Sequence, residues 1–461
     1  MKSKCFVILT VIFLLIIFST QFKLINRPVI DNDEGIYLTS FLLVDKGFQA
    51  YKKTYFSQPP GFLLTVYPGF ILFGKTLQAA RLMISLWSLI GLLVVVWIGF
   101  ELKNKWTGLL AASLLFLIPS YSNQSLTFQS DVLITTFSLI SLAALLRFGK
   151  KFYLPWFVVS SFFLNLAFWT KFDITFFPSF FLALFLIYKD KKFFSKRTIN
   201  LILIFFTVSL AFFIIFIFPF GIREVFNNSI LLRFQAASIS ASFSLFYYLK
   251  KDLFLSVIIL TSLFLGFLKN KNIRYPLIII YVWSIFVLII FYFYQPLFPH
   301  HLVIITVPLI LLFSQLISLS FKDKLILEII TIIFLVLSLS NRIYLTAKTS
   351  VKLINDQQQN AVKLINKFTN IGDAVVSDEE ILNGISGRLP PPELSDISQV
   401  RIKSNNLSPE NFKNIINIYK PKLIIPWNGR LASIKNFKEV IKDYKIIYSN
   451  SDSTKIILLR Q

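Results

Sequence analysis

The 461-residue sequence is poor in residues that soluble enzymes often use for crosslinks, metal sites and surface charge. It holds one cysteine, Cys5, and two histidines, and only 15% of its residues are charged. A single cysteine excludes an intrachain disulfide. A soluble domain usually carries about 25% charged residues, so this composition excludes an ordinary soluble globular protein.

The abundant residues indicate a lipid environment. Hydrophobic residues make up 55% of the chain, Phe alone occurs 52 times, and the mean hydropathy is +0.69. This composition is typical of a membrane protein. The formal net charge of +24 arises from Lys and Arg in short runs between apolar stretches, as in loops beside anionic lipid. We therefore expect membrane lipid, and not nucleic acid, as a partner.

Apolar stretches long enough to cross a bilayer recur from the N-terminus to about Ser340. The first follows Lys2 and Lys4 without a small-residue cleavage site before Lys23, which indicates an uncleaved helix. The shorter stretch 60–74 predicts a helix that lies at the interface or re-enters the membrane. The fold class is thus an α-helical polytopic membrane protein of about eleven transmembrane helices, at 5–22, 82–100, 107–120, 131–147, 154–170, 174–188, 199–219, 252–268, 275–294, 302–320 and 324–340.

Basic and non-basic loops alternate between these stretches. By the positive-inside rule the short basic loops face the cytoplasm; they lie near 103–105, 147–151, 189–197, 269–274 and 322–324. This places the N-terminus in the cytoplasm and everything after Ser340 outside. The first outer loop, 23–60, then carries the acidic pair Asp33 and Glu34 to the outer face of the cell membrane.

The composition becomes polar near residue 341, and residues 341–461 predict a small extracytoplasmic α/β domain. Ser408, followed by Pro409, is a favourable helix N-cap. Strands that alternate with helices indicate a compact α/β unit. The predicted strands are 375–377, 423–426, 446–448 and 456–458, and the predicted helices are 356–368, 409–419 and 433–442.

Charged or titratable residues at the outer ends of the spans are the candidate site residues, because charge in or near a span is costly and is usually retained for function. Each has a plain structural alternative: a solvated loop acid, a helix-end charge that interacts with the helix dipole, a snorkelling lysine or an interfacial histidine. Their shared side of the membrane favours function. They are Asp33, Glu34, Arg81, Asp131, Lys171, Asp173, His300 and His301.

These residue types suit group transfer from a phosphate-linked lipid donor. Carboxylates can deprotonate an acceptor hydroxyl, and Asp33 and Glu34 are also candidates for holding a divalent metal such as Mg²⁺ or Mn²⁺. Lys171, Arg81 and the two histidines can neutralise a leaving phosphate. Aromatic and apolar walls can seat a polyprenyl chain.

The order of these motifs resembles the GT-C class of membrane glycosyltransferases, in particular the glycosyltransferase 39 or protein O-mannosyltransferase-like family, to which the lipid A aminoarabinose transferases are related. The resemblance covers roughly residues 30–340, and it implies that residues 1–340 form the transmembrane transferase domain. The tail, with Ser377-Asp378-Glu379 and Ser386-Gly387-Arg388, is similar to the extracytoplasmic domain of bacterial members. The motifs are Asp33-Glu34-Gly35-Ile36-Tyr37, Gln58-Pro59-Pro60-Gly61-Phe62, Ala80-Arg81-Leu82, Gln129-Ser130-Asp131, Thr170-Lys171-Phe172 and Pro299-His300-His301-Leu302.

The resemblance implies an inverting transfer of a sugar from a polyprenyl-phosphate donor to a glycan, lipid or protein acceptor. It implies that Asp33 is the catalytic acid of the first loop, with Glu34 beside it, and that Asp131 is a second acidic position. It places Lys171 at the outer-turn lysine of the family. The two histidines match only a subgroup of the family.

Other functions also fit parts of the sequence. A transporter or flippase of lipid-linked sugars would hold charges near the bilayer midplane, whereas the middles of these spans are almost free of charge. A polysaccharide polymerase or ligase would use Arg and His in a large outer loop, and Arg223 and Arg233 keep that alternative open. A mere membrane anchor for the tail would not need so many spans.

Overall fold

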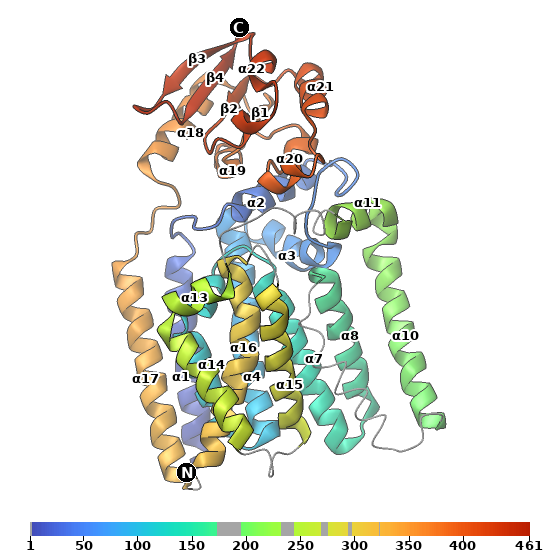
Figure 1. Ribbon diagram of the computed structural model, residues 1–461, viewed down its shortest axis with the longest axis vertical. Helices are drawn as coiled ribbons and strands as arrows, with labels where there is room; N and C mark the ends of the chain where they lie inside the picture. The colour runs from blue at the N-terminus through green and yellow to red at the C-terminus, as the bar shows by residue number, and fades with distance from the viewer. Residues whose placement is uncertain (1, 173–194, 232–243, 269–274, 294–296, 322) are drawn as a thin grey trace. The chain divides into compact units, whose positions relative to one another are not determined.

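The computed structural model describes residues 2–172, 195–231, 244–268, 275–293, 297–321 and 323–461 (Figure 1). The predicted span 174–188, Asp173 and Arg233 lie outside the described residues. Every other predicted span falls on a helix. The apolar helices are α1 (Lys2–Leu24), α3 (Pro60–Leu72), α4 (Leu77–Leu102), α5 (Lys105–Leu117), α7 (Asp131–Lys151), α8 (Leu154–Thr170), α10 (Lys196–Phe216), α14 (Leu253–Leu268), α15 (Tyr275–Phe293), α16 (Leu302–Ser320) and α17 (Lys324–Lys348).

Six helices within the described ranges are long and apolar enough to cross a membrane, and several shorter apolar helices accompany them. This confirms the predicted class, a polytopic α-helical membrane protein. Short elements connect the long helices: α2 (Asp33–Asp45), α6 (Pro119–Gln124), η2 (Phe218–Phe220), α11 (Ile222–Phe226), η3 (Asn227–Leu231), α13 (Leu245–Lys251) and η5 (Pro299–His301).

The chain forms two compact units. The first comprises Met1–Ile25, Leu82–Phe216 and Ser240–Thr349. The second comprises Asn26–Arg81, Ile217–Ile239 and Ser350–Gln461. Each unit is therefore built from segments that lie far apart in the sequence.

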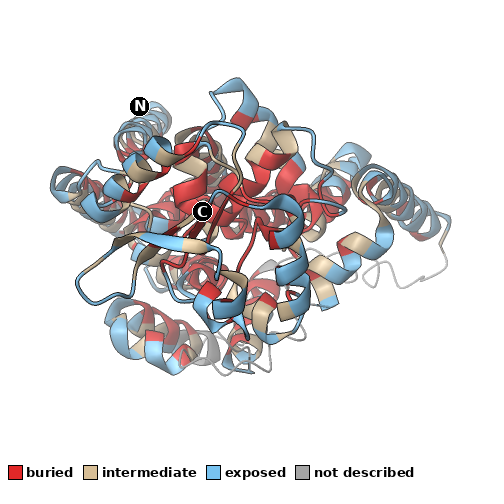
Figure 2. Ribbon diagram, turned by 90° about the horizontal axis from the view of Figure 1, so that it is seen from above, coloured by how far each residue is buried: buried red, intermediate tan, exposed pale blue. Residues whose placement is uncertain are grey.

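In the first unit α7 and α16 form the centre, with 89% and 83% of their apolar windows buried. α7 packs against α8, and α16 packs against α5, α14 and α15. In contrast, α1 and α10 have 28% and 22% of theirs buried, so their apolar side chains suit contact with lipid. Figure 2 colours the buried residues red and the exposed residues pale blue.

The polar tail in the second unit contains a four-stranded sheet of order β1-β2-β4-β3. β1 and β2 are parallel, and the other neighbours are antiparallel. Side chains alternate between two cores: Val375, Leu423 and Ile425 face one, and Val376 and Ile424 face the other. The strands are β1 (Val375–Ser377), β2 (Leu423–Ile425), β3 (Tyr444–Ser449) and β4 (Ile456–Arg460), and the helices are α18 (Asp356–Phe368), α19 (Glu380–Ser386), η6 (Pro392–Leu394), α20 (Gln399–Lys403), α21 (Pro409–Tyr419), η7 (Leu431–Ser433) and α22 (Phe437–Val440).

The four predicted strands of the tail and two of its predicted helices are confirmed. The Ser408 side chain caps α21 by accepting a hydrogen bond from the Asn411 N–H at 3.1 Å. The predicted helix 433–442 is wrong in extent, because Asn436 adopts a left-handed φ of 63° and leaves only the short α22. The prediction that α17 ends at 340 is also wrong, since the helix continues to Lys348.

Candidate active site

Asp33 and Glu34 form the first turn of helix α2, so the segment 23–60 contains a helix that was not predicted from the sequence. Asp31 precedes the helix and accepts a hydrogen bond from the Asp33 N–H at 3.1 Å. Acidic side chains at this end interact favourably with the helix dipole. The two neighbours differ in exposure: Asp33 is half-buried, whereas Glu34 is fully buried.

Glu34 is held by Arg81, which lies in the first helical turns of α4. Arg81 Nε donates to Glu34 Oε1 at 2.8 Å, and Arg81 Nη2 donates to Glu34 Oε2 at 2.7 Å. Both side chains are 0% exposed. Arg81 Nη1 also donates to the Arg27 carbonyl at 2.7 Å. A planar guanidinium binds a carboxylate in this two-bond geometry with high specificity, so Arg81 joins α2 to the chain that follows α1.

The Gln58-Pro59-Pro60 motif supports the other side of α2. Gln58 Nε2 donates to the Tyr37 hydroxyl at 2.7 Å, and the Tyr51 hydroxyl donates to the Gln58 carbonyl at 2.5 Å. The Tyr37 and Phe62 rings pack edge to face with centroids 4.9 Å apart. Three of the motifs noted in the sequence therefore meet in the second unit around α2.

Asp131 and Lys171 form a second buried ion pair, within the first unit. α7 and α8 pack against each other, and the start of α7 meets the end of α8, which brings the two residues together. Lys171 Nζ lies 2.6 Å from Asp131 Oδ1, and the side chains are 2% and 1% exposed. The acid lies at a helix N-terminus and the lysine at a helix C-terminus, where the helix dipoles favour each charge.

The two histidines lie in η5, immediately before α16, and both are buried. His301 Nδ1 accepts a hydrogen bond from the Phe298 N–H at 3.2 Å. A neutral imidazole in this arrangement carries its proton on Nε2, which is then a donor. The two imidazole rings lie edge to face with centroids 4.4 Å apart.

Helix α6 contacts both the histidine segment and α7. It packs against η5, α7 and α16, and the Ser120 hydroxyl lies 3.0 Å from the Thr306 hydroxyl. The first unit thus carries Asp131, Lys171 and the histidines, and α6 contacts the elements to which Asp131 and the histidines belong. The second unit gathers Asp33, Glu34 and Arg81 around the start of α2.

The candidate carboxylates and histidines do not form a ready metal site. Within the described ranges no group of three or more His, Cys, Asp or Glu side chains is arranged to hold a metal ion. Both oxygens of Glu34 already bind the Arg81 guanidinium, so Glu34 does not fit as a metal ligand.

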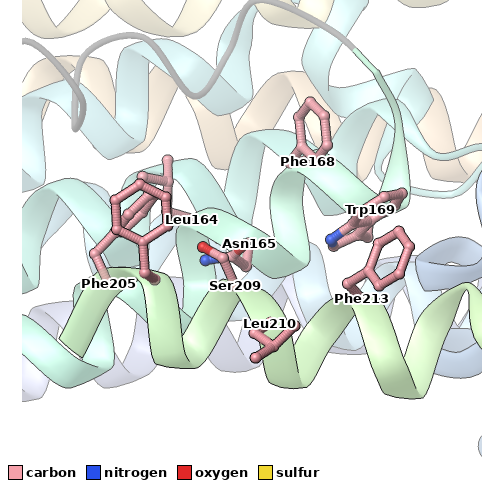
Figure 3. A pocket seen from close by; sticks show the side chains of 9 residues that line it. Leu164, Asn165, Phe168, Trp169, Phe205, Ser209, Leu210 and Phe213 are labelled. Carbon is pink, nitrogen blue, oxygen red and sulfur yellow. The ribbon is translucent and has the colours of Figure 1, made fainter. Parts of the chain in front are cut away.

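An apolar groove of about 520 Å³ lies between α8 and α10 (Figure 3). It leads along α8 toward Trp169, two residues before Lys171. This groove could not be predicted from the sequence, because its walls consist of ordinary apolar span residues. They are Leu164, Asn165, Phe168, Trp169, Phe205, Phe206, Ser209, Leu210 and Phe213.

Sequence reasoning also missed Arg342, which it placed beyond the last span. Arg342 is 2% exposed on α17, and its guanidinium lies 5.4 Å from the centroid of the Phe116 ring. The sequence does hold a signal for it. Apolar residues keep helical spacing after Ser340, and Arg342 is the lone arginine within that run.

Residues 57–218 match the family model of dolichyl-phosphate-mannose-protein mannosyltransferases. No curated protein matches the chain. Among solved structures, ArnT from Cupriavidus metallidurans in the apo state matches with a TM-score of 0.71 and 14% identity, covering 99% of this chain and 98% of that chain. The same protein bound to undecaprenyl phosphate matches with a TM-score of 0.67, 14% identity and the same coverage.

A more distant match is the archaeal oligosaccharyltransferase AglB from Archaeoglobus fulgidus, in complex with an inhibitory peptide and a dolichol-phosphate. Its TM-score is 0.56 at 12% identity, covering 100% of this chain and 75% of that chain. The chain therefore has the GT-C fold of membrane glycosyltransferases. The fold is similar to that of ArnT over nearly the full length of both chains, which confirms the predicted GT-C type of fold.

Proposed function

We propose that this protein is an inverting glycosyltransferase that moves a sugar from a polyprenyl-phosphate donor to an acceptor at the outer face of the cell membrane. The observation that supports the proposal most directly is the difference in burial between the two neighbouring acids, Asp33 and Glu34. Arg81 neutralises Glu34 and buries it, whereas Asp33 on the same helical turn keeps part of its surface exposed. Asp33 is thus the carboxylate that an acceptor can reach.

In this proposal Asp33 acts as the general base. The acceptor hydroxyl gives its proton to the Asp33 carboxylate while its oxygen bonds to the anomeric carbon of the sugar. The bond from that carbon to the phosphate oxygen breaks, and polyprenyl phosphate leaves with the bonding electrons. A single displacement of this kind inverts the anomeric centre, and a positioned base typically contributes about 10²–10⁴-fold.

The leaving phosphate needs positive charge and hydrogen-bond donors. Lys171 and the Nε2 donor of His301 meet that need in the first unit, where preorganised donors stabilise developing charge at little reorganisation cost. We assign Arg81 a different role from phosphate binding. Its guanidinium is directed at Glu34 and the Arg27 carbonyl, so it positions α2.

The groove between α8 and α10 suits the polyprenyl tail. Its walls are almost wholly apolar and aromatic, and Lys171 follows directly at the C-terminal end of α8. A polyprenyl phosphate that lies along α8 would bring its head toward that lysine. The fold match to ArnT bound to undecaprenyl phosphate supports a polyprenyl phosphate as the kind of donor.

The placement of lysine and arginine supports a cytoplasmic N-terminus and an extracytoplasmic domain over residues 341–461. The acceptor would then meet the donor on the outer side. The test supplies the purified full-length protein with a panel of radiolabelled polyprenyl-phosphate sugars, with and without EDTA. Transfer with inversion from one donor supports the proposal. Transport of lipid-linked sugar across proteoliposomes without transfer would favour the flippase and overturn it.

A further inference from the structure

Two glycines let helix α2 and helix α19 of the polar tail pack at backbone distance within the second unit. A Cβ placed on Gly35 of α2 would lie 2.5 Å from the Ile381 backbone nitrogen of α19. A Cβ placed on Gly384 of α19 would lie 2.4 Å from Leu38 Cδ2 of α2. Real Cβ atoms essentially never approach other atoms this closely. At Gly35 the obstructing atoms belong to backbone, so only glycine fits, whereas a side chain at 384 would force the buried Leu38 side chain to move.

A hydrogen bond fixes how far along each other helices α2 and α19 lie. The Thr39 hydroxyl on α2 donates to the Glu380 carbonyl at 3.0 Å, and both residues are buried. Figure 1 shows α19 directly beside α2. Since a buried hydroxyl without a partner is costly, the helices have one favoured register.

The α19 end of this contact is itself rigid. Glu380 Oε2 accepts from Arg430 Nη2 at 2.7 Å, and Glu380 Oε1 accepts from the Ile397 N–H at 3.0 Å. Asp378, just before α19, accepts from the backbone N–H groups of Trp427 and Leu431 at 2.6 and 2.9 Å. The bonds from Trp427, Arg430 and Leu431 tie the start of α19 to the segment that follows β2.

A second contact joins the same two segments of the chain. The Ser395 hydroxyl donates to the Tyr55 carbonyl at 3.2 Å, and the Arg401 guanidinium lies 3.9 Å from the centroid of the Tyr55 ring. The tail therefore holds the α2–α3 segment at two places.

We propose that α19 positions Asp33, so that the polar tail is a working part of the active site and not an independent appendage. The proposal rests on the proposed function above. Asp33 lies two residues before Gly35 on the same helix, and a rigid helix transmits any displacement at Gly35 to the turn that carries the base. Gly35, Leu38, Thr39 and Gly384 are positioning residues, because they act through Asp33.

The test is a set of single and double variants in the full-length protein. Gly384→Ala introduces the Cβ that collides with Leu38, and misplacement of a reacting group by about 1 Å can cost about 10²-fold. Leu38→Ala removes the Cδ2 and Cγ atoms involved and leaves Leu38 Cβ at 3.6 Å, an ordinary contact. The matched control is Gly372→Ala, since nothing lies within 4 Å of that added Cβ.

We expect Gly384→Ala to lower kcat about tenfold or more while the donor KM stays within about twofold, because a shifted base affects turnover and not donor binding. Adding Leu38→Ala is expected to restore kcat, and Gly372→Ala is expected to leave it unchanged. A Gly384→Ala variant with wild-type kcat overturns the proposal. So does a loss that Leu38→Ala does not rescue, which would indicate a general folding defect. Wild-type protein without transfer from any donor would instead overturn the proposed function.

A disulfide provides a second test that does not depend on colliding side chains. The Cβ of a residue at 384 lies 3.6 Å from Leu38 Cβ, within the range of about 3.5–4.5 Å found in disulfides. Leu38→Cys with Gly384→Cys, in a Cys5→Ser background, should therefore crosslink on oxidation. Retained turnover in the oxidised form supports fixed positioning. Turnover that is lost on oxidation and regained on reduction overturns it, because α2 would then have to leave α19 during the cycle.

Discussion

Arg81 and Glu34 form a two-bond ion pair in which neither side chain is exposed, although 47 residues separate them in the sequence. Removing two charges from water is costly, and the pair persists because each partner satisfies the other. The pair fixes the start of α2 and leaves Asp33 as the reachable acid. Its energetic role can be separated from catalysis by substitution.

Glu34→Gln should destabilise the fold strongly. Loss of one partner leaves the Arg81 charge buried, which costs about 3–5 kcal/mol, and thermal unfolding of the purified protein should show a clear drop in Tm. Asp45→Asn is the matched control on the same helix, because Asp45 pairs with the exposed Lys75 at 2.8 Å and such pairs contribute about 0–1 kcal/mol. Equal Tm values for the two variants would contradict a structural role for the buried pair.

Asp33→Asn should abolish most transfer with little change in Tm. The amide keeps the size of the side chain but cannot take the acceptor proton, so kcat is expected to fall about 10²–10⁴-fold. Polyprenyl phosphate binding, measured by titration in detergent, should remain close to wild type. A well-folded Asp33→Asn protein with near wild-type turnover would refute the assignment of the base.

Lys171→Met should weaken binding of polyprenyl phosphate. A hydrogen bond to a charged group contributes about 1.5–3 kcal/mol, which corresponds to an increase in Kd of about 10–150-fold. The substitution also leaves Asp131 buried without its partner cation, so Tm should fall as well.

A double variant separates these two effects of Lys171. Lys171→Met with Asp131→Asn removes both buried charges, and replacing a buried pair by neutral groups is often nearly neutral for stability. We expect the double variant to recover Tm but not phosphate affinity. Recovery of both would mean that Lys171 serves only to hold Asp131.

Ser209→Trp should obstruct the groove between α8 and α10. Ser209 lines the groove, and an indole there would occupy space assigned to the polyprenyl tail. The KM for a long-chain donor should rise while the KM for a short-chain analogue stays the same. Thr207→Trp, at an exposed position of the same helix, is the control. An equal effect on long and short donors would place the tail elsewhere.

Much of the architecture could be predicted from the sequence, because a span must be apolar over its whole length and leaves a strong signal. Helix α2 was missed because residues 23–60 were treated as one outer loop between two apolar stretches. Asp33 and Glu34 in a first turn, before Ile36 and Leu38, were the available helix signal. The glycine itself is explained only by α19, which lies more than 340 residues further along the chain.

The candidate residues could also be collected from the sequence, but their pairing could not. Loop charge indicates the side of the membrane on which a residue lies, and it does not determine which cation meets which acid. Arg81 was expected at the donor phosphate, whereas its guanidinium is directed at Glu34 and a backbone carbonyl. That choice depends on which residues the fold brings beside Arg81, 47 residues after Glu34 in the sequence, and no local pattern records it.

The pH dependence of the tail gives a last prediction, through Glu379 at the start of α19. Burial raises the pKa of this carboxyl above its ordinary value of 4.5, although Asn428, Arg430 and Gln358 oppose the shift. An acid whose pKa is higher in the folded state stabilises the fold fully below its unfolded pKa, and this contribution is lost as the pH rises through the folded value.

The wild-type Tm should therefore fall relative to that of Glu379→Gln as the pH is raised from 4.5, because the amide cannot ionise. Glu439→Gln, at an exposed position of α22, should show the wild-type dependence. Scanning fluorimetry of the full-length protein over this range makes the measurement. Parallel curves for wild type and Glu379→Gln would show that the carboxyl ionises equally easily in the folded and unfolded chain, and would remove Glu379 as a source of pH sensitivity next to the helix that positions Asp33.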